Sequence, residues 1–135
     1  MSLKNQVQLI TYVDRLANGG LNKLNTLLSH EFAGLFGGVH LLPFFNPIDG
    51  EDAGFDPIDH TQVDKRIGTW SDIASIGATH DIMADLIVNH VSAQSLVFQD
   101  VLAQGSQSPY FDLIMTKEKV FGLEATQADI DKIYR

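Results

Sequence analysis

Two short apolar stretches limit the fold of this chain more than any other feature. They are "GGVHLLPFF" (37–45) and "HDIMADLIVNH" (80–90), and neither shows the alternation of polar and apolar residues that a half-exposed strand has. Strands that are apolar throughout are buried on both faces, as in parallel sheets. A third stretch, "VQLITYV" (7–13), is rich in β-branched and aromatic residues and is also typical of a strand.

Helical patterns lie between these strands. One apolar helical stripe is predicted from positions that recur at three and four residues, namely Leu21, Leu24, Leu27 and Leu28, with Phe32 a turn later. A second helix is expected from Trp70 to Gly77. Parallel strands need such crossover helices, so the sequence predicts an α/β fold. The residues between the second strand and the second helix, about 46–68, are expected to form a long irregular loop.

The rhythm of strands and helices changes after the third strand. A helix capped by Ser92 or Ser95 and closed by Gly105 is expected next, followed by loops and short strands. A last helix is expected to have Thr126 and Asp129 as its capping pair. We therefore divide the chain into 1–92, which carries the predicted strands, and 93–135, the start of a separate subregion.

Composition excludes several classes of function. The 135 residues carry a formal net charge of -8 with 9 Lys+Arg, which disfavours nucleic acid and anionic membranes as partners. Without cysteine there is no disulfide, thiol nucleophile or thiolate metal site. The opening "MSLKNQVQLI" lacks the apolar core of a secretory signal, and no apolar run reaches membrane-spanning length. These features predict a cytoplasmic protein with one sizeable core.

Polar residues gather where the second and third strands end. In parallel α/β folds, the loops that follow the strands build the ligand site. The candidates are Asp49, Asp52, Asp56, Asp59 and His60 after the second strand, and Asp85, Asn89 and His90 near the end of the third. If the third strand runs to residue 90, Asp85 and Asn89 share one face and His90 points the other way.

Each candidate also has a structural interpretation. Aspartates in a loop with Pro and Gly commonly form turns by bonding their own backbone. Asp85, inside an apolar run, needs a partner such as an arginine or a backbone donor. His40, between Val39 and Leu41, is interpreted as a core histidine. The spacing of the aspartates does not follow the calcium-loop pattern, so no metal is assigned.

Several motifs resemble one enzyme family. "DLIVNH" is similar to a short motif shared across the α-amylase superfamily, glycoside hydrolase family 13, and "DAGFDPIDHT" resembles the narrower sucrose phosphorylase group. Further similar segments are "QLITYVDRL", "IGTWSDI" and "ADIDKIYR", so the resemblance extends over nearly the whole chain and fits the amino-terminal portion of that group.

The resemblance implies a (β/α)8 barrel, with about three of its strands here and a subdomain inserted after the third. It implies retaining transfer of an α-glucosyl group from sucrose to inorganic phosphate, without cofactor or metal. Asp52 and His90 would then bind glucosyl hydroxyls and Phe55 would contact the sugar ring. Asp85 and Asn89 would support the site.

The resemblance also implies an incomplete site. Retaining transfer needs a carboxylate nucleophile and a second carboxyl group about 5 Å away, and a whole barrel takes about 250 residues. In the family these catalytic groups follow later strands, so we expect no catalytic residue in this segment, no activity of the isolated chain, and self-association through its open sheet. The full-length enzyme is a candidate homodimer.

Two other classes of function stay open. One is a non-catalytic sugar-binding module. The other is a different family 13 enzyme, a hydrolase or a phosphorylase with another acceptor, because the donor-side residues contact only the glucosyl group.

Overall fold

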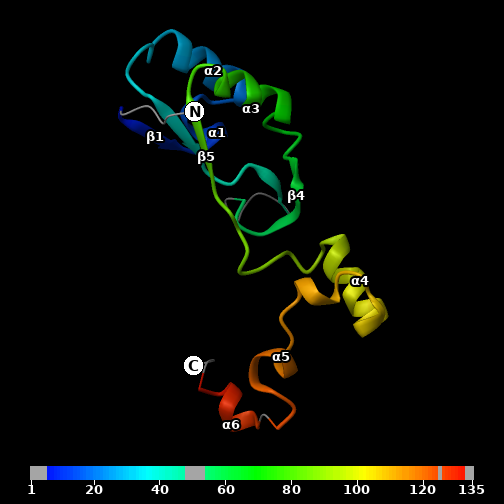
Figure 1. The fold of residues 1–135 in the computed structure, drawn as a ribbon. Helices are drawn as coiled ribbons and strands as arrows, with labels where there is room; N and C mark the ends of the chain where they lie inside the picture. The colour runs from blue at the N-terminus through cyan, green and yellow to red at the C-terminus, as the bar shows by residue number, and fades with distance from the viewer. Residues whose placement is uncertain (1–5, 48–53, 125, 133–135) are drawn as a thin grey trace. The chain divides into compact units, whose positions relative to one another are not determined.

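The computed structural model describes residues 6–47, 54–124 and 126–132 (Figure 1). The chain divides into two compact units, Met1–Ser95 and Leu96–Arg135. The strands of the first unit are β1 (Gln8–Thr11), β2 (Gly38–Leu41), β3 (Phe45–Pro47), β4 (Pro57–Val63) and β5 (Asp81–Ala84). Its helices are α1 (Val13–Leu16), α2 (Leu21–Ser29) and α3 (Trp70–Gly77).

The main sheet is parallel and has the strand order β1-β2-β5. Leu9, Val39 and Ile82 are register partners on one face, and this face packs against the apolar stripe of α2. Ile10, His40 and Met83 form the next row, on the opposite face. The predicted α/β class with parallel strands is confirmed, whereas the (β/α)8 barrel stays a prediction.

Both predicted helices of the first unit are present. Leu21, Leu24 and Leu28 of α2 are buried in the core, as their spacing predicts. α3 begins with a capping box, in which Asp72 accepts from the backbone N–H of Thr69 at 2.8 Å and from its hydroxyl at 2.7 Å. The helix contacts α2 and adds Ile73 and Ile76 to the same core.

The long loop predicted for 46–68 is wrong, because β4 lies within it. β4 pairs with β3 as an antiparallel ribbon whose register shifts twice. Pro57 is tolerated as the first residue of this strand, where no ladder bond is lost. The polar residues in the middle of β4 suit a two-stranded ribbon that is half exposed.

The third predicted strand is too long, because β5 ends at Ala84 rather than at residue 90. The residues that follow form an irregular segment in which Leu86 is 86% and Val88 79% exposed. The expectation that Asp85 and Asn89 share a strand face is therefore wrong. A continuous apolar run predicted a buried strand, but periodicity alone does not show where such a strand stops.

The second unit is helical in its described residues. It contains α4 (Leu96–Gln104), two 3₁₀ turns (η1, Gly105–Gln107, and η2, Phe111–Leu113), α5 (Lys117–Phe121) and α6 (Gln127–Ile130). The short strands expected here are not observed between residues 96 and 124. The predicted capping pair of the last helix is confirmed, since Asp129 accepts from the backbone N–H of Thr126 at 3.1 Å and from its hydroxyl at 2.7 Å. Its assignment as an inserted subdomain stays a prediction.

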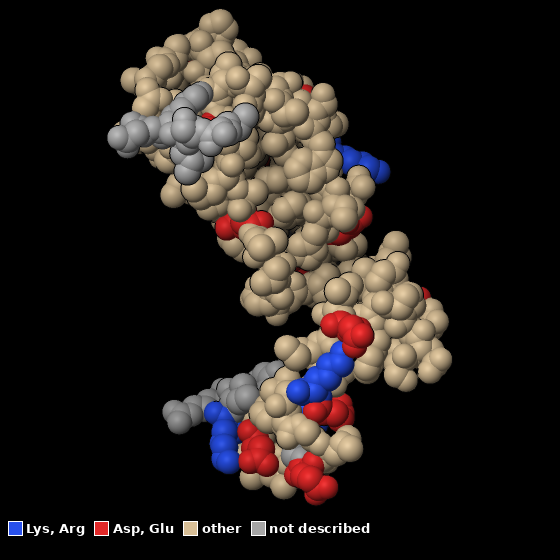
Figure 2. All heavy atoms as spheres, in the orientation of Figure 1, with Lys and Arg blue, Asp and Glu red and all other residues tan. Residues whose placement is uncertain are grey.

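Surface charge is sparse and mixed. On the face drawn in Figure 2, the basic side chains of the second unit are interspersed with acidic ones and form no continuous patch. Within the ranges that the structure describes, no helix has both the length and the apolar character needed to span a membrane.

Candidate functional site

Phe55 lies at a sharp turn before β4. The preceding residue, Gly54, has a positive φ of 81°, and a Cβ there would lie 2.5 Å from the carbonyl oxygen of Pro43. Only glycine fits this combination of a left-handed backbone and a close approach to the chain. The turn leaves the Phe55 side chain 39% exposed, so its ring is open to a ligand.

His90 lies against the same turn. Its Nε2 bonds to the backbone carbonyl oxygen of Phe55, and two residues later the N–H of Ser92 donates to the carbonyl of Pro57 at 3.2 Å. Because a carbonyl can only accept, Nε2 carries the proton and Nδ1 is left as the acceptor when the ring is neutral. The structure thus brings Phe55 and His90 together across 35 residues of sequence.

The other predicted residues lie apart from this pair or outside the described residues. Asp52 falls in 48–53, which the structure does not describe. Asn89 is exposed in the segment after β5. Asp85 is half-buried, and its Oδ2 is 3.2 Å from Nε2 of His40. Asp85 thus has a partner, as the sequence requires, but this partner is a histidine and not the expected arginine or backbone donor. The pairing of the part-buried His40 ring agrees with its interpretation as a satisfied core histidine.

Asp59 lies within β4 and bonds the chain two residues further on. One carboxylate oxygen accepts from both the backbone N–H and the hydroxyl of Thr61, each at 2.7 Å. The bond to the local backbone agrees with the structural role predicted for these aspartates, although Asp59 lies in a strand and not in the predicted loop.

A cluster of aromatic rings beside β3 and β4 was not predicted from the sequence. Trp70 meets the Phe44 ring edge-on at 5.4 Å, and Phe45 lies 5.8 Å from the imidazole of His60. The Trp70 indole N–H also donates to the carbonyl of Thr61 at 2.8 Å. The signal in the sequence was the pair Phe44 and Phe45 at the end of "GGVHLLPFF", since adjacent bulky rings stabilise the packing of β3 and β4.

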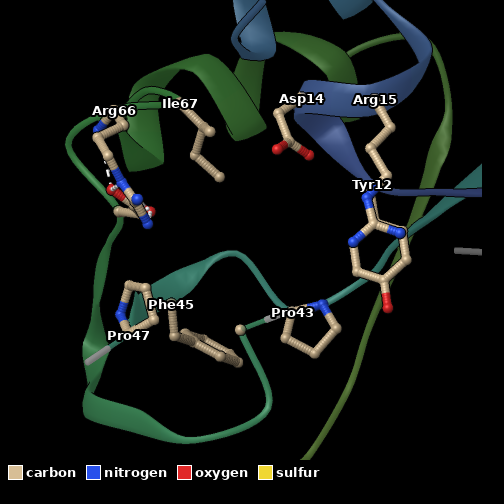
Figure 3. Close-up of a pocket in the computed structure, with 10 residues that line it drawn as sticks. Tyr12, Asp14, Arg15, Pro43, Phe45, Pro47, Arg66 and Ile67 are labelled. Carbon is tan, nitrogen blue, oxygen red and sulfur yellow. Dashed lines mark hydrogen bonds and ion pairs between the residues drawn. The ribbon is translucent and has the colours of Figure 1, made fainter. Parts of the chain in front are cut away.

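Figure 3 shows a small pocket, open to solvent, beyond the carboxyl ends of β1 and β2. Asp14 and Ile67 point into it from one side, and Pro43 and Phe45 border the other. The full lining is Tyr12, Asp14, Arg15, Pro43, Phe45, Pro47, Gly54, Asp64, Arg66 and Ile67. Gly54 of this lining directly precedes Phe55, whereas neither Phe55 nor His90 is among the described residues that line the pocket.

An ion pair fixes the wall of this pocket. The Nε of Arg66 donates to both carboxylate oxygens of Asp64, at 3.0 and 2.9 Å, and its backbone N–H donates to Oδ1 at 2.9 Å. Burial alone raises the pKa of Asp64, but these hydrogen bonds and the positive charge of Arg66 outweigh it and lower the pKa. The Asp64 backbone N–H also donates to the Phe44 carbonyl at 2.9 Å. This backbone bond links the residue that carries the ion pair, just after β4, to the chain after β2.

We expect Asp64→Asn to destabilise the chain by about 1–2 kcal/mol at pH 7, because it removes a charge-assisted pair. The lowered pKa means that this stabilisation is present above the ordinary aspartate pKa of about 4 and is lost as pH falls through the lowered value. Urea unfolding of both proteins from pH 7 downward measures this. Their free energies of unfolding should converge at acid pH, and a constant difference would contradict the assignment.

The matched control is Asp112→Asn. Asp112 pairs with Lys119 at 3.0 Å, but its side chain is 96% exposed. Exposed pairs contribute little, so this variant should change the free energy of unfolding by less than about 0.5 kcal/mol.

The described residues offer no cluster of three or more His, Asp or Glu side chains placed to hold a metal ion. This finding does not extend to the acidic residues of 48–53.

Comparison with known proteins gives strong matches. A sucrose phosphorylase of Agrobacterium vitis is 59% identical over 133 residues, which are 98% of this chain and 27% of that protein. One from Bifidobacterium adolescentis is 53% identical over the same share of this chain and 26% of its own length. No family model matches. The chain is a homologue of sucrose phosphorylase and fits its amino-terminal portion.

A solved structure agrees with the homology to sucrose phosphorylase. The crystal structure of sucrose 6F-phosphate phosphorylase from Thermoanaerobacter thermosaccharolyticum superposes with a TM-score of 0.83 at 45% identity. The match covers 98% of this chain and 26% of that protein. The resemblance read from the sequence motifs is thereby confirmed, and the chain spans about a quarter of the length of each of these relatives.

Proposed function

We propose that this chain forms the donor-sugar side of a glucosyl phosphorylase of glycoside hydrolase family 13, with sucrose as donor and inorganic phosphate as acceptor. The reaction is retaining transfer of the α-glucosyl group, which gives glucose 1-phosphate and fructose. The observation that carries the proposal is 59% identity to a sucrose phosphorylase over 98% of the chain. The place of action is the cytoplasm, and the full-length enzyme is a homodimer.

Phe55 and His90 are proposed to contact the glucosyl ring directly. An exposed aromatic ring next to a fixed hydrogen-bonding group suits a sugar, whose C–H face is apolar and whose rim carries hydroxyls. The bond from Nε2 of His90 to the Phe55 carbonyl supports this, because it leaves Nδ1 of the neutral ring as an acceptor for a hydroxyl. Asp52 is proposed to accept from further hydroxyls, while Asp85 and Asn89 act as supporting residues.

The covalent chemistry is proposed to reside elsewhere in the enzyme. A retaining mechanism needs a carboxylate that attacks the anomeric carbon and an acid that protonates the leaving fructose. We assign neither role to this segment. In the proposed enzyme, β1, β2 and β5 are three strands of a (β/α)8 barrel, in which catalytic residues follow several different strands. The subdomain that begins at about residue 93 is inserted after the third.

A second candidate is a phosphorylase that acts on sucrose 6F-phosphate. The solved structure with a TM-score of 0.83 belongs to a protein of that name. The two candidates share the glucosyl group, so the residues of this segment serve both, and the rest of the enzyme selects the leaving sugar. A non-catalytic sugar-binding role requires the same contacts without turnover.

The test is a chimera in which this chain replaces the matching 133 residues of the Agrobacterium vitis sucrose phosphorylase. We expect the chimera to form glucose 1-phosphate from sucrose and phosphate within about tenfold of the parent kcat/KM, because all proposed donor contacts are retained. Thermal unfolding serves as the folding control. A folded, monodisperse chimera without phosphorolysis would overturn the proposed function.

A further inference from the structure

His40 is held in place by its strand and faces away from the main core. Its neighbours Val39 and Leu41 are fully buried, while His40 stands in the row with Ile10 and Met83 on the other side of the sheet. Its Nε2 contacts Oδ2 of Asp85 at 3.2 Å, and the two side chains are only 17% and 25% exposed. A carboxylate can only accept, so Nε2 of His40 is the donor.

This bond is not needed to align the strands. β2 and β5 are already paired from Gly38 with Asp81 to Leu41 with Ala84. Asp85 follows the last paired residue, so the bond to His40 extends the link between the strands into the segment after β5. A hydrogen bond at this place sets the direction in which the chain leaves the sheet.

The segment 85–92 is tied at both ends and exposed between them. His40 holds its start, and the bonds to the carbonyls of Phe55 and Pro57 hold its end. Of the side chains between, Ile87 is buried, whereas Leu86 and Val88 are exposed. The segment is thus held by bonds to β2 at one end and to the turn of Phe55 at the other, with few buried side chains between them.

We propose that His40 is a positioning residue for the sugar site: by donating to Asp85 it fixes the segment 85–92 and so places His90 against Phe55. The consequence for catalysis rests on the proposed function, whereas the placement of His90 does not. His40 touches neither sugar nor reacting atoms in this proposal and acts only through Asp85.

Kinetics of the chimera test the consequence for catalysis. We expect His40→Leu to lower kcat/KM for sucrose at least tenfold, mainly through a higher KM, because His90 is misplaced before the sugar binds. His40→Gln retains an N–H donor and should recover most of the loss. His30→Leu is the matched control, since His30 is an exposed residue at the end of α2. An unchanged His40→Leu enzyme, or no recovery with glutamine, would overturn the inference.

A second measurement does not depend on activity. In the chimera labelled with ¹⁵N at histidine, in which the sheet is covered by the rest of the enzyme, long-range imidazole spectra report the ring nitrogens of His90. His40→Leu should shift these signals and His40→Gln should leave them near their original positions. Unmoved His90 signals in His40→Leu would overturn the inference even if the chimera is active. An inactive wild-type chimera with shifted His90 signals would instead reject the proposed function alone.

Discussion

In the chimeric phosphorylase, His90→Ala and Asp52→Ala should each lower kcat/KM for sucrose by about 10²- to 10³-fold, equivalent to about 3–4 kcal/mol. In the proposed site, each variant removes hydrogen bonds to sugar hydroxyls, and such bonds strengthen as the ring flattens toward an oxocarbenium-like transition state. His90→Ala also deletes the bond to the Phe55 carbonyl, so it loosens the turn that carries the proposed sugar platform.

The comparison variant is Asp56→Ala. Asp56 lies two residues after Gly54 in the same turn and is half-buried. We interpret it as a structural residue, so its loss should change kcat/KM less than about threefold while lowering thermal stability. Steady-state kinetics on folded variants make the comparison. Equal and mild losses in all three variants would contradict the assignment of Asp52 and His90 to the sugar.

The helices and the parallel strands could be predicted because their signals are local. Leu21, Leu24 and Leu28 share one side of a helix by spacing alone, and Thr69 followed by Asp72 is a complete capping box within four residues. The end of β5 and the existence of β4 could not be predicted in this way. Both depend on which other segment of the chain pairs with the strand, and the sequence pattern of the strand alone does not contain that information.

The contacts of the candidate site fall into the same two groups: those between neighbours in sequence could be predicted, and those between distant residues could not. Asp59 bonding Thr61 is a contact over two residues, which turn chemistry predicts. His40 meeting Asp85 spans 45 residues, and physical reasoning required only that Asp85 have some partner. Phe55 and His90 were selected by resemblance to a family rather than by spacing. The structure adds the bond that joins them, which no sequence pattern indicated.

The 135-residue chain expressed by itself should form no detectable glucose 1-phosphate from sucrose and should self-associate. For catalysis, a sugar held by Phe55 and His90 still needs a nucleophile and an acid about 5 Å apart, and we assign neither to this segment. For association, the sheet order leaves β1 and β5 as edges without a partner strand among the described residues. Unpaired strands with apolar side chains pair readily with other chains.

Size-exclusion chromatography with light scattering, together with a phosphorolysis assay, measures both expectations. Ile10 is 63% and Met83 51% exposed on the open sheet face, so a double variant with Ile10→Gln and Met83→Gln should shift the chain toward lower mass if this face drives association. A control with Leu102→Gln changes an equally exposed apolar residue of α4, outside the sheet, and should leave the mass unchanged if the sheet alone is responsible.

A sharp monomer peak for the unmodified chain would contradict the expectation that the open sheet drives association. Phosphorolysis that copurifies with the chain and is lost in His90→Ala would show that this segment contains the catalytic groups, because contaminating host enzyme would not respond to that substitution.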